Sequence, residues 1–155
     1  MNNKLLGLVF LATTLGLAAQ PLTFTFEEYQ VDAVSVKVGL DYPLEKLEGM
    51  KPTFSQSVEL SAEGNGKAVT IVGGSTITTD VHAVPAKDSL YQIELKHEYV
   101  ALISEGIPII SSRGVQTERA LKVGDRAVIG AMKTGSGGEE DLQSQAYIFV
   151  VKLTV

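Results

Sequence analysis

The longest strand pattern in this chain is SLYQIELKHEYVALI, residues 89–103. From Tyr91 to Ala101 every second residue is apolar or aromatic, with His97 in the same series, and the intervening residues Gln92, Glu94, Lys96 and Glu98 are polar or charged. A period of two places alternate side chains on opposite faces of a strand. One wet face is typical of antiparallel sheets, because parallel sheets are covered on both sides. The stretch therefore predicts a half-buried antiparallel strand.

Further strand patterns precede this stretch, at LTFTF (22–26), VDAVSVKVGL (31–40), SVELS (57–61), AVTIV (68–72) and STITTDVHAV (75–84). Gly64-Asn65-Gly66 predicts a tight hairpin, because glycine and asparagine adopt positive φ at low cost. The pair Gly73-Gly74 ends one strand and Pro85 ends another. Only DYPLEKLEGMKP, residues 41–52, could form a helical turn, and its prolines keep that turn short.

The segment that follows is GIPIISSRGVQTERALKVGDRAVIG, residues 106–130. Its pattern predicts two strands, 115–121 and 126–131, paired as a hairpin through a turn at 122–125 in which Gly124-Asp125 makes the corner. Gly130 marks a bulge or a close backbone approach. The last run, AYIFVVKLTV (146–155), is apolar on both faces. We predict that it is an internal strand, because such a strand with an unpaired edge would template aggregation.

Short strands joined by turn signals, with no helical period beyond one turn, predict an all-β fold. We expect an antiparallel β-sandwich or open barrel with at most one short helical turn. The sequence contains no internal repeat and no sign of a second domain. Residues 20–155 are therefore expected to form a single β domain.

Residues 1–19 have the pattern of a secretory signal peptide. Lys4 precedes an apolar run from Leu5 to Ala18, and Gly16 and Ala18 supply the small residues for cleavage after Ala18, with cleavage after Ala19 as the alternative. A retained membrane anchor is the other interpretation, but the run is shorter than the roughly 20 apolar residues that span a bilayer. We therefore expect an exported protein that is periplasmic, associated with the outer membrane or secreted, with no transmembrane helix in the mature chain.

The composition excludes several classes of protein. The chain has no cysteine, so it is no lipoprotein and has no disulfides. It has 13 basic and 18 acidic residues, and removal of Lys4 with the signal changes the formal net charge from −5 to −6. Nucleic-acid binding needs a clustered basic surface, so we expect no nucleic-acid partner. The same balance offers no polybasic attraction to anionic lipid.

No residue pattern indicates a reaction. His82 and His97 could form a metal or acid–base site only if the fold brought them together, and the position of His97 in an apolar series favours a core histidine with its hydrogen bonds satisfied. The acidic cluster GEED (138–141) favours a solvated loop over a calcium site, and Glu27 and Glu28 should point to opposite faces. No serine lies in a nucleophile elbow, and no phosphate loop is present. We therefore predict no enzyme, no catalytic or cofactor-binding residues, no cofactor and no metal site.

Residues 65–130 and the closing strand resemble the later half of the secretin domain, the β-rich module of outer-membrane secretion and pilus channels. The resemblance rests on VGGSTITTDVHAVPAKDSLYQIELKHEYV and on GIPIISSRGVQTERALKVGDRAVIGAM, with matching positions at Arg113, Thr117, Gly124, Ile129 and Gly130. Ala131 stands where the family usually has a second glycine. KTGSGGEEDLQSQ (133–145) replaces the inner gate hairpins of the family, and the ring-building N-terminal domains are missing, which argues against an independent gated channel.

Two functions from different classes follow. The resemblance implies a structural or accessory component of a secretion or pilus assembly, with protein partners that are further copies of the chain or an envelope secretion complex. The alternative is a freestanding periplasmic or secreted β-sandwich that binds a small ligand or a protein partner.

Overall fold

The computed structural model describes residues 21–32, 42–103, 109–134 and 145–155. Its strands are β1 (Thr23–Asp32), β2 (Phe54–Glu59), β3 (Asn65–Val72), β4 (Ser75–Pro85), β5 (Leu90–Ile103), β6 (Ile109–Lys122), β7 (Arg126–Thr134) and β8 (Gln145–Thr154). Two short 3-10 turns, η2 (Leu44–Leu47) and η3 (Lys87–Ser89), are its helical elements among these residues. The predicted all-β fold and the predicted turn within residues 41–52 are confirmed; the turn η3 was not predicted. The predicted signal segment and most of the predicted strand 31–40 lie outside the described residues.

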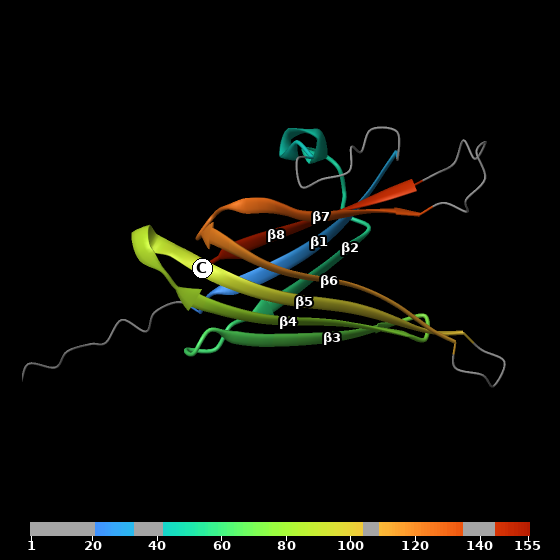
Figure 1. Ribbon diagram of the computed structural model, residues 1–155, viewed down its shortest axis with the longest axis horizontal. Coiled ribbons are helices and arrows are strands. Elements are labelled where there is room, and N and C mark those ends of the chain that lie inside the picture. Colours follow the sequence, from blue (N-terminus) through green and yellow to red (C-terminus); the bar gives the residue numbers. More distant parts are fainter. Residues whose placement is uncertain (1–20, 33–41, 104–108, 135–144) are drawn as a thin grey trace, which may run out of the picture.

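The strands form two antiparallel four-stranded sheets that pack as a sandwich (Figure 1). Sheet A has the order β2-β1-β8-β7, and sheet B has the order β3-β4-β5-β6. β8 lies between β1 and β7, with Thr23 opposite Thr154 on one side and Arg126 opposite Lys152 on the other. The prediction that the last strand is internal is therefore confirmed.

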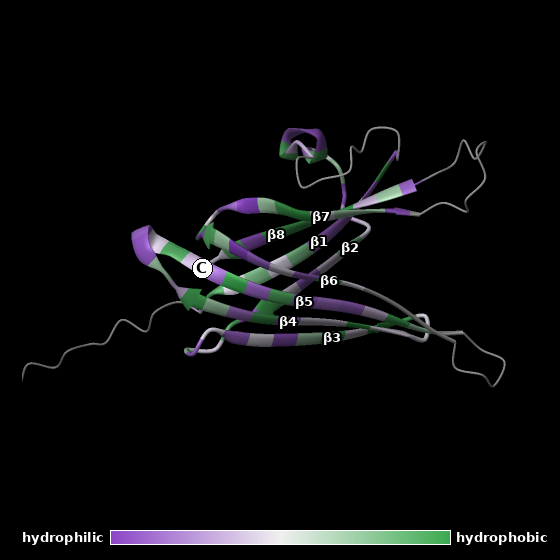
Figure 2. Ribbon diagram, viewed as in Figure 1, coloured by the Kyte–Doolittle hydropathy of each residue, from purple (hydrophilic) through white to green (hydrophobic). Residues whose placement is uncertain are grey.

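The buried side chains follow the period-two patterns of the sequence. Figure 2 shows alternating hydrophilic and hydrophobic bands along β4 and β5. In β5, Ile93, Leu95 and His97 are buried between the sheets, and Gln92, Glu94 and Lys96 are exposed. β8 is apolar on both faces for two reasons. Its residues Phe149, Val151 and Leu153 join the main core, and its residues Ala146, Ile148 and Val150 join a second cluster on the outer face of sheet A.

The predicted hairpin at residues 122–125 is wrong in its pairing, although the turn itself is present. Gly124 has φ +93°, and the Asp125 amide donates to the carbonyl oxygen of Lys122 over 3.1 Å. The strands on either side belong to different sheets, β6 to sheet B and β7 to sheet A. The Gly124 amide donates instead to the carbonyl oxygen of Leu153 in β8, over 2.7 Å. The turn thus carries the chain from sheet B to sheet A. Leu121 and Ala127, which lie on either side of the turn, are buried in the same core from opposite sheets.

The predicted hairpin at Gly64-Asn65-Gly66 is wrong for the same reason. β2 pairs with β1 and β3 pairs with β4, so this turn also joins the two sheets. Gly64 has φ +81°, and a Cβ there would collide with the carbonyl oxygen of Ala83. A glycine is needed where the chain crosses close to the other strand. By contrast, Gly73 and Gly74 both have positive φ and join β3 and β4 as a true hairpin, with Val72 opposite Ser75.

Candidate functional site

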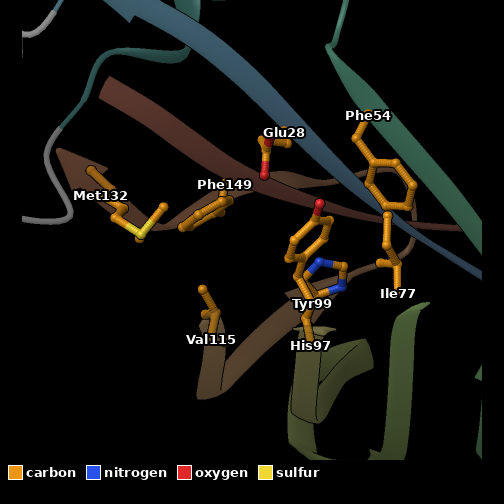
Figure 3. Close-up of a pocket in the computed structure, with 11 residues that line it drawn as sticks. Glu28, Phe54, Ile77, His97, Tyr99, Val115, Met132 and Phe149 are labelled. Atoms are coloured by element: carbon orange, nitrogen blue, oxygen red, sulfur yellow. The ribbon is translucent and has the colours of Figure 1, made fainter. Parts of the chain in front are cut away.

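A cavity of about 330 Å³ lies between the two sheets at one end of the sandwich. We call this the hollow end. The cavity is lined by Glu28, Phe54, Ile77, His97, Tyr99, Gly114, Val115, Gly130, Ala131, Met132 and Phe149. These residues come from seven of the eight strands of sheet A and sheet B, so the walls belong to the sheets themselves (Figure 3). A pocket of this size with mostly apolar walls and a few polar groups is typical of small-molecule sites.

A glycine leaves space in one wall of the cavity. A Cβ at Gly130 would lie 3.4 Å from Cδ2 of Phe149, so the absence of a side chain there leaves room beside the Phe149 ring. The ladder between β7 and β8 also shifts register between Val128 and Gly130, so Gly130 lies opposite Phe149. The bulge that Gly130 predicted is therefore present at this point, and it shapes one wall of the cavity.

Glu28 is the carboxylate of this cavity. It follows Phe24 and Phe26 on the inner face of β1, and only 9% of its surface is exposed. The hydroxyl of Thr53 lies 3.0 Å from the carbonyl oxygen of Glu28 and 3.3 Å from its Oε1, and its one proton can be donated to either. The Thr53 amide donates to the Glu28 carbonyl oxygen over 2.7 Å. Burial of a carboxylate is costly unless polar partners compensate it. The hydroxyl of Thr53 is a polar group within reach of this carboxylate.

Tyr99 supplies the second polar group. Its hydroxyl donates to Oγ of Ser75 over 2.9 Å. In Figure 3 the Glu28 carboxylate and the Tyr99 hydroxyl point toward one another from the two sheets, with the Phe149 ring and the Met132 thioether further along the cavity. The cavity thus has one polar part, shared between the sheets, and one apolar part.

His97 belongs to a buried chain of hydrogen bonds. Thr79 donates its hydroxyl proton to Oε1 of Gln56, and Nε2 of Gln56 donates to Oγ1 of Thr70 over 2.8 Å. A hydroxyl has one proton, so Nδ1 of His97 is the donor in its 2.8 Å contact with Oγ1 of Thr79. This chain fixes the imidazole tautomer, in which Nε2 is an acceptor. The ring also stacks on Phe26, with the two centroids 3.8 Å apart.

The two histidines that could have formed a site together lie apart in the structure. His97 is buried between the sheets, as its position in an apolar series predicted, whereas His82 lies on the outer face of sheet B, where Nδ1 contacts Oδ1 of Asn65 at 2.7 Å. Glu27 and Glu28 point to opposite faces, as predicted: Glu27 accepts from Arg126 over 3.0 Å on the outer face. Within the described ranges, no group of three or more His, Cys, Asp or Glu residues is arranged to hold a metal ion. The acidic cluster 138–141 lies outside those ranges.

The cavity residues Glu28, Tyr99 and Met132 were not predicted as a site. One signal in the sequence could have identified Glu28, because it has the same parity as Phe24 and Phe26 and so had to enter the interior of the sandwich. No local pattern connects it with Met132, which lies on β7 of the same sheet, or with Tyr99, which lies on β5 of sheet B.

The described residues include no helix that is long and apolar enough to cross a membrane. No protein-family model and no curated protein sequence matches this chain.

Three solved structures that contain the Salmonella SPI-1 secretin InvG are similar to it. The InvG secretin domain matches with a TM-score of 0.39 and 10% identity, over 86% of this chain and 60% of that chain. The injectisome secretin InvG matches with a TM-score of 0.37 and 11% identity, over 86% of this chain and 61% of that chain. A match within the basal body of InvG, PrgH and PrgK has the same TM-score and identity and covers 43% of that chain. This chain thus spans about three fifths or less of the chains it matches. Similarity of this degree identifies no shared family.

Proposed function

We propose that this chain is an exported, non-enzymatic β protein that serves as a structural or accessory component of a secretion or pilus assembly. The signal pattern of residues 1–19 and the secretin-like residues 65–130 support the proposal. Its partners would be further copies of the chain or an envelope secretion complex.

The edge of sheet B carries this proposal. β3 is an edge strand, and among the described residues its ladder of backbone hydrogen bonds is with β4. Val69, Ile71 and Val72 are 57%, 73% and 57% exposed, three of the largest exposures of big apolar side chains in the described chain. A strand edge with apolar side chains is a template for pairing with another chain. An assembly that adds a strand to β3 would cover both the backbone edge and these side chains.

A substitution in β3 tests this role. The full chain is expressed in its source cell, and its association with envelope complexes is followed by fractionation and its size by sedimentation. We expect Ile71→Lys to release the protein from the complex, because a charge on the exposed face of β3 opposes the docking of another apolar strand. The matched control is Val123→Lys, in the exposed turn between β6 and β7, which should remain associated. A wild-type protein that stays monomeric and never associates with the envelope would exclude the assembly role.

The non-enzymatic part of the proposal has its own test. His82 and His97 were the one catalytic pair that the sequence suggested, and they lie on opposite faces of sheet B. If a hydrolase or transferase activity were found in the purified protein and lost in the double variant His82→Gln, His97→Gln, with folding retained, the protein would be an enzyme.

The cavity at the hollow end favours a second candidate function, a freestanding β-sandwich that binds a small ligand. Its walls come from both sheets, and it combines aromatic rings with a buried carboxylate. Gene neighbourhood separates the two candidates at little cost: secretion or pilus genes beside this one support the first, and transport or metabolic genes support the second.

A further inference from the structure

We infer that the cavity at the hollow end binds a small aromatic or aliphatic amine, with its ammonium group beside Glu28 and its apolar body between Phe149, Val115 and Met132. This inference rests on the second candidate function, and it specifies the chemical class of the ligand.

The polar groups of the cavity all offer acceptors to a ligand. Ionised, the Glu28 carboxylate accepts hydrogen bonds and donates none. The Tyr99 hydroxyl gives its proton to Ser75, so any further hydrogen bond that it makes is as an acceptor. His97 gives its Nδ1 proton to Thr79, so Nε2 of the neutral ring is an acceptor as well. A ligand that complements these groups must donate, and an ammonium group has three donors.

The aromatic walls favour a positive charge for an independent reason. Phe54, Tyr99 and Phe149 line the cavity, and the faces of aromatic rings attract cations. A carboxylate in an apolar site is also stabilised by a cation, because the attraction between opposite charges is stronger where water is excluded. The lining residues include no lysine or arginine that would balance a ligand anion beside Glu28.

The remaining walls set the shape of the ligand. Ile77, Val115, Met132 and Phe149 are apolar, and Met132 adapts its shape to a flat ring better than a branched side chain does. A volume of about 330 Å³ has room for a two-ring body. Transfer of such a body from water into these walls supplies affinity, and Glu28 supplies the selectivity for an amine.

Three probes with the same ring system test the inference. They are 1-naphthylmethylamine, 1-naphthalenemethanol and 1-naphthoate, which are cationic, neutral and anionic at neutral pH. Their dissociation constants are measured by calorimetry on protein purified from cells that express the full chain. We expect the amine to bind at least 10-fold more tightly than the alcohol, and the carboxylate to bind more weakly than the alcohol.

Two variants and a control locate the binding. Glu28→Gln should weaken amine binding about 10-fold and leave the alcohol nearly unchanged, because it removes the charge and keeps the shape. Val115→Phe should weaken all three probes by filling the cavity. Glu94→Gln, on the exposed face of β5, should change none of them. Thermal melting confirms that each variant is folded, and the comparison of the three probes on wild-type protein does not depend on any variant.

The outcomes separate the inference from the function on which it rests. If the three probes bind alike, or if the amine is unaffected by Glu28→Gln, the cavity binds small molecules but the ligand class is wrong. If no probe binds at millimolar concentration, or if binding is insensitive to Val115→Phe, the ligand-binding function itself is overturned. Neither result bears on the assembly role of β3.

Discussion

Sheet A buries opposite faces at the two ends of the sandwich. At the packed end, its inner face is buried against sheet B by Phe24, Val151 and Leu153, all at most 1% exposed, and its outer face presents polar groups such as the contacting hydroxyls of Thr25 and Ser57. At the hollow end, the inner face lines the cavity. There the outer face is buried instead, and the 3-10 turn η2 covers it through Leu47. Figure 1 shows η2 beside that end of β7 and β8.

This difference explains how a cavity persists in a small protein. A void between two sheets normally costs stability, and the surrounding structure tends to relax into it. The outer cluster of Tyr29, Leu47, Ile148 and Val150 fixes the same stretch of sheet A from behind. Packing energy that the inner face does not provide at the hollow end is thus provided by the outer face, so the inner face there is available for function.

Deletion of residues 146–155 has the largest expected effect, because β8 is common to both ends. The deletion removes the strand between β1 and β7 and both sets of its buried side chains. We expect an unfolded or insoluble protein, a loss well above the ~1 kcal/mol of an ordinary point substitution. Circular dichroism and thermal melting measure the effect. Deletion of Val155 alone is the control, since it lies outside β8 and is 67% exposed. A soluble truncated protein with an unchanged Tm would show that β8 is dispensable.

A pair of phenylalanine substitutions compares the two ends directly. Phe24→Ala at the packed end should cost about 3–5 kcal/mol of unfolding free energy, because it opens a cavity among fully buried side chains. Phe54→Ala at the hollow end should cost less, about 1–2 kcal/mol, since it only enlarges an existing space. Urea denaturation at equal protein concentration gives both values. Equal losses would mean that the two ends are packed alike.

Leu47→Ala tests the cover on the outer face. Leu47 is 1% exposed, and its truncation should cost about 2–3 kcal/mol. Met50→Ala, a few residues further at a 38% exposed position, should change stability by less than about 0.5 kcal/mol. Hydrogen exchange adds spatial detail: the amides of residues 146–150 should exchange faster in Leu47→Ala, while those of residues 151–153 stay protected. Uniform acceleration along β8 would contradict the separate support of the hollow end.

Two neighbouring threonines test the polar chain of His97, which borders the cavity. Thr79→Val keeps the shape but removes the hydroxyl that contacts both Gln56 and His97, so it should cost about 1–3 kcal/mol. Thr78→Val, on the opposite face of β4, should stay within about 0.5 kcal/mol of the wild type. The measurement is the free energy of unfolding in urea. Similar small effects for both variants would show that the buried chain contributes no stability.

The smallest expected effect concerns the pH dependence of the outer cluster. Burial raises the pKa of the Tyr29 hydroxyl above 10.0, and the hydrogen bond to Glu27 raises it further, against the opposing charge of Arg126. The unfolded chain therefore releases this proton at lower pH than the folded protein does. The contribution to stability is complete below pH 10 and is lost as the pH rises through the folded-state pKa.

Tyr29→Phe removes this titration. The variant should lose about 1 kcal/mol near neutral pH, because Tyr29 no longer donates to Glu27 or accepts from Arg126. Its Tm should then fall less steeply than that of the wild type between pH 9 and 11. Parallel Tm curves would show that Tyr29 does not titrate differently in the folded protein.

Most of the local structure could be predicted from the pattern of residues. The alternation in residues 91–101 predicted which side chains of β5 enter the core, and the two apolar faces of residues 146–155 predicted an internal strand. Both predictions hold because side chains alternate along any strand, whatever its partner, and because apolar side chains on both faces must be covered on both sides.

Strand pairing and the cavity depended on the tertiary structure. Gly73-Gly74, Gly64 and Gly124 all specify a reversal of the chain through positive φ, but only the first joins strands that pair with each other. A turn residue determines the backbone in its own turn, whereas the partner of a strand is chosen by contacts distant in sequence, as when Thr23 pairs with Thr154. The meeting of Glu28, Tyr99 and Met132 has the same origin, because each was placed on a face by its own strand, and distant strand pairing in sheet A together with the packing of the two sheets brought them to one cavity.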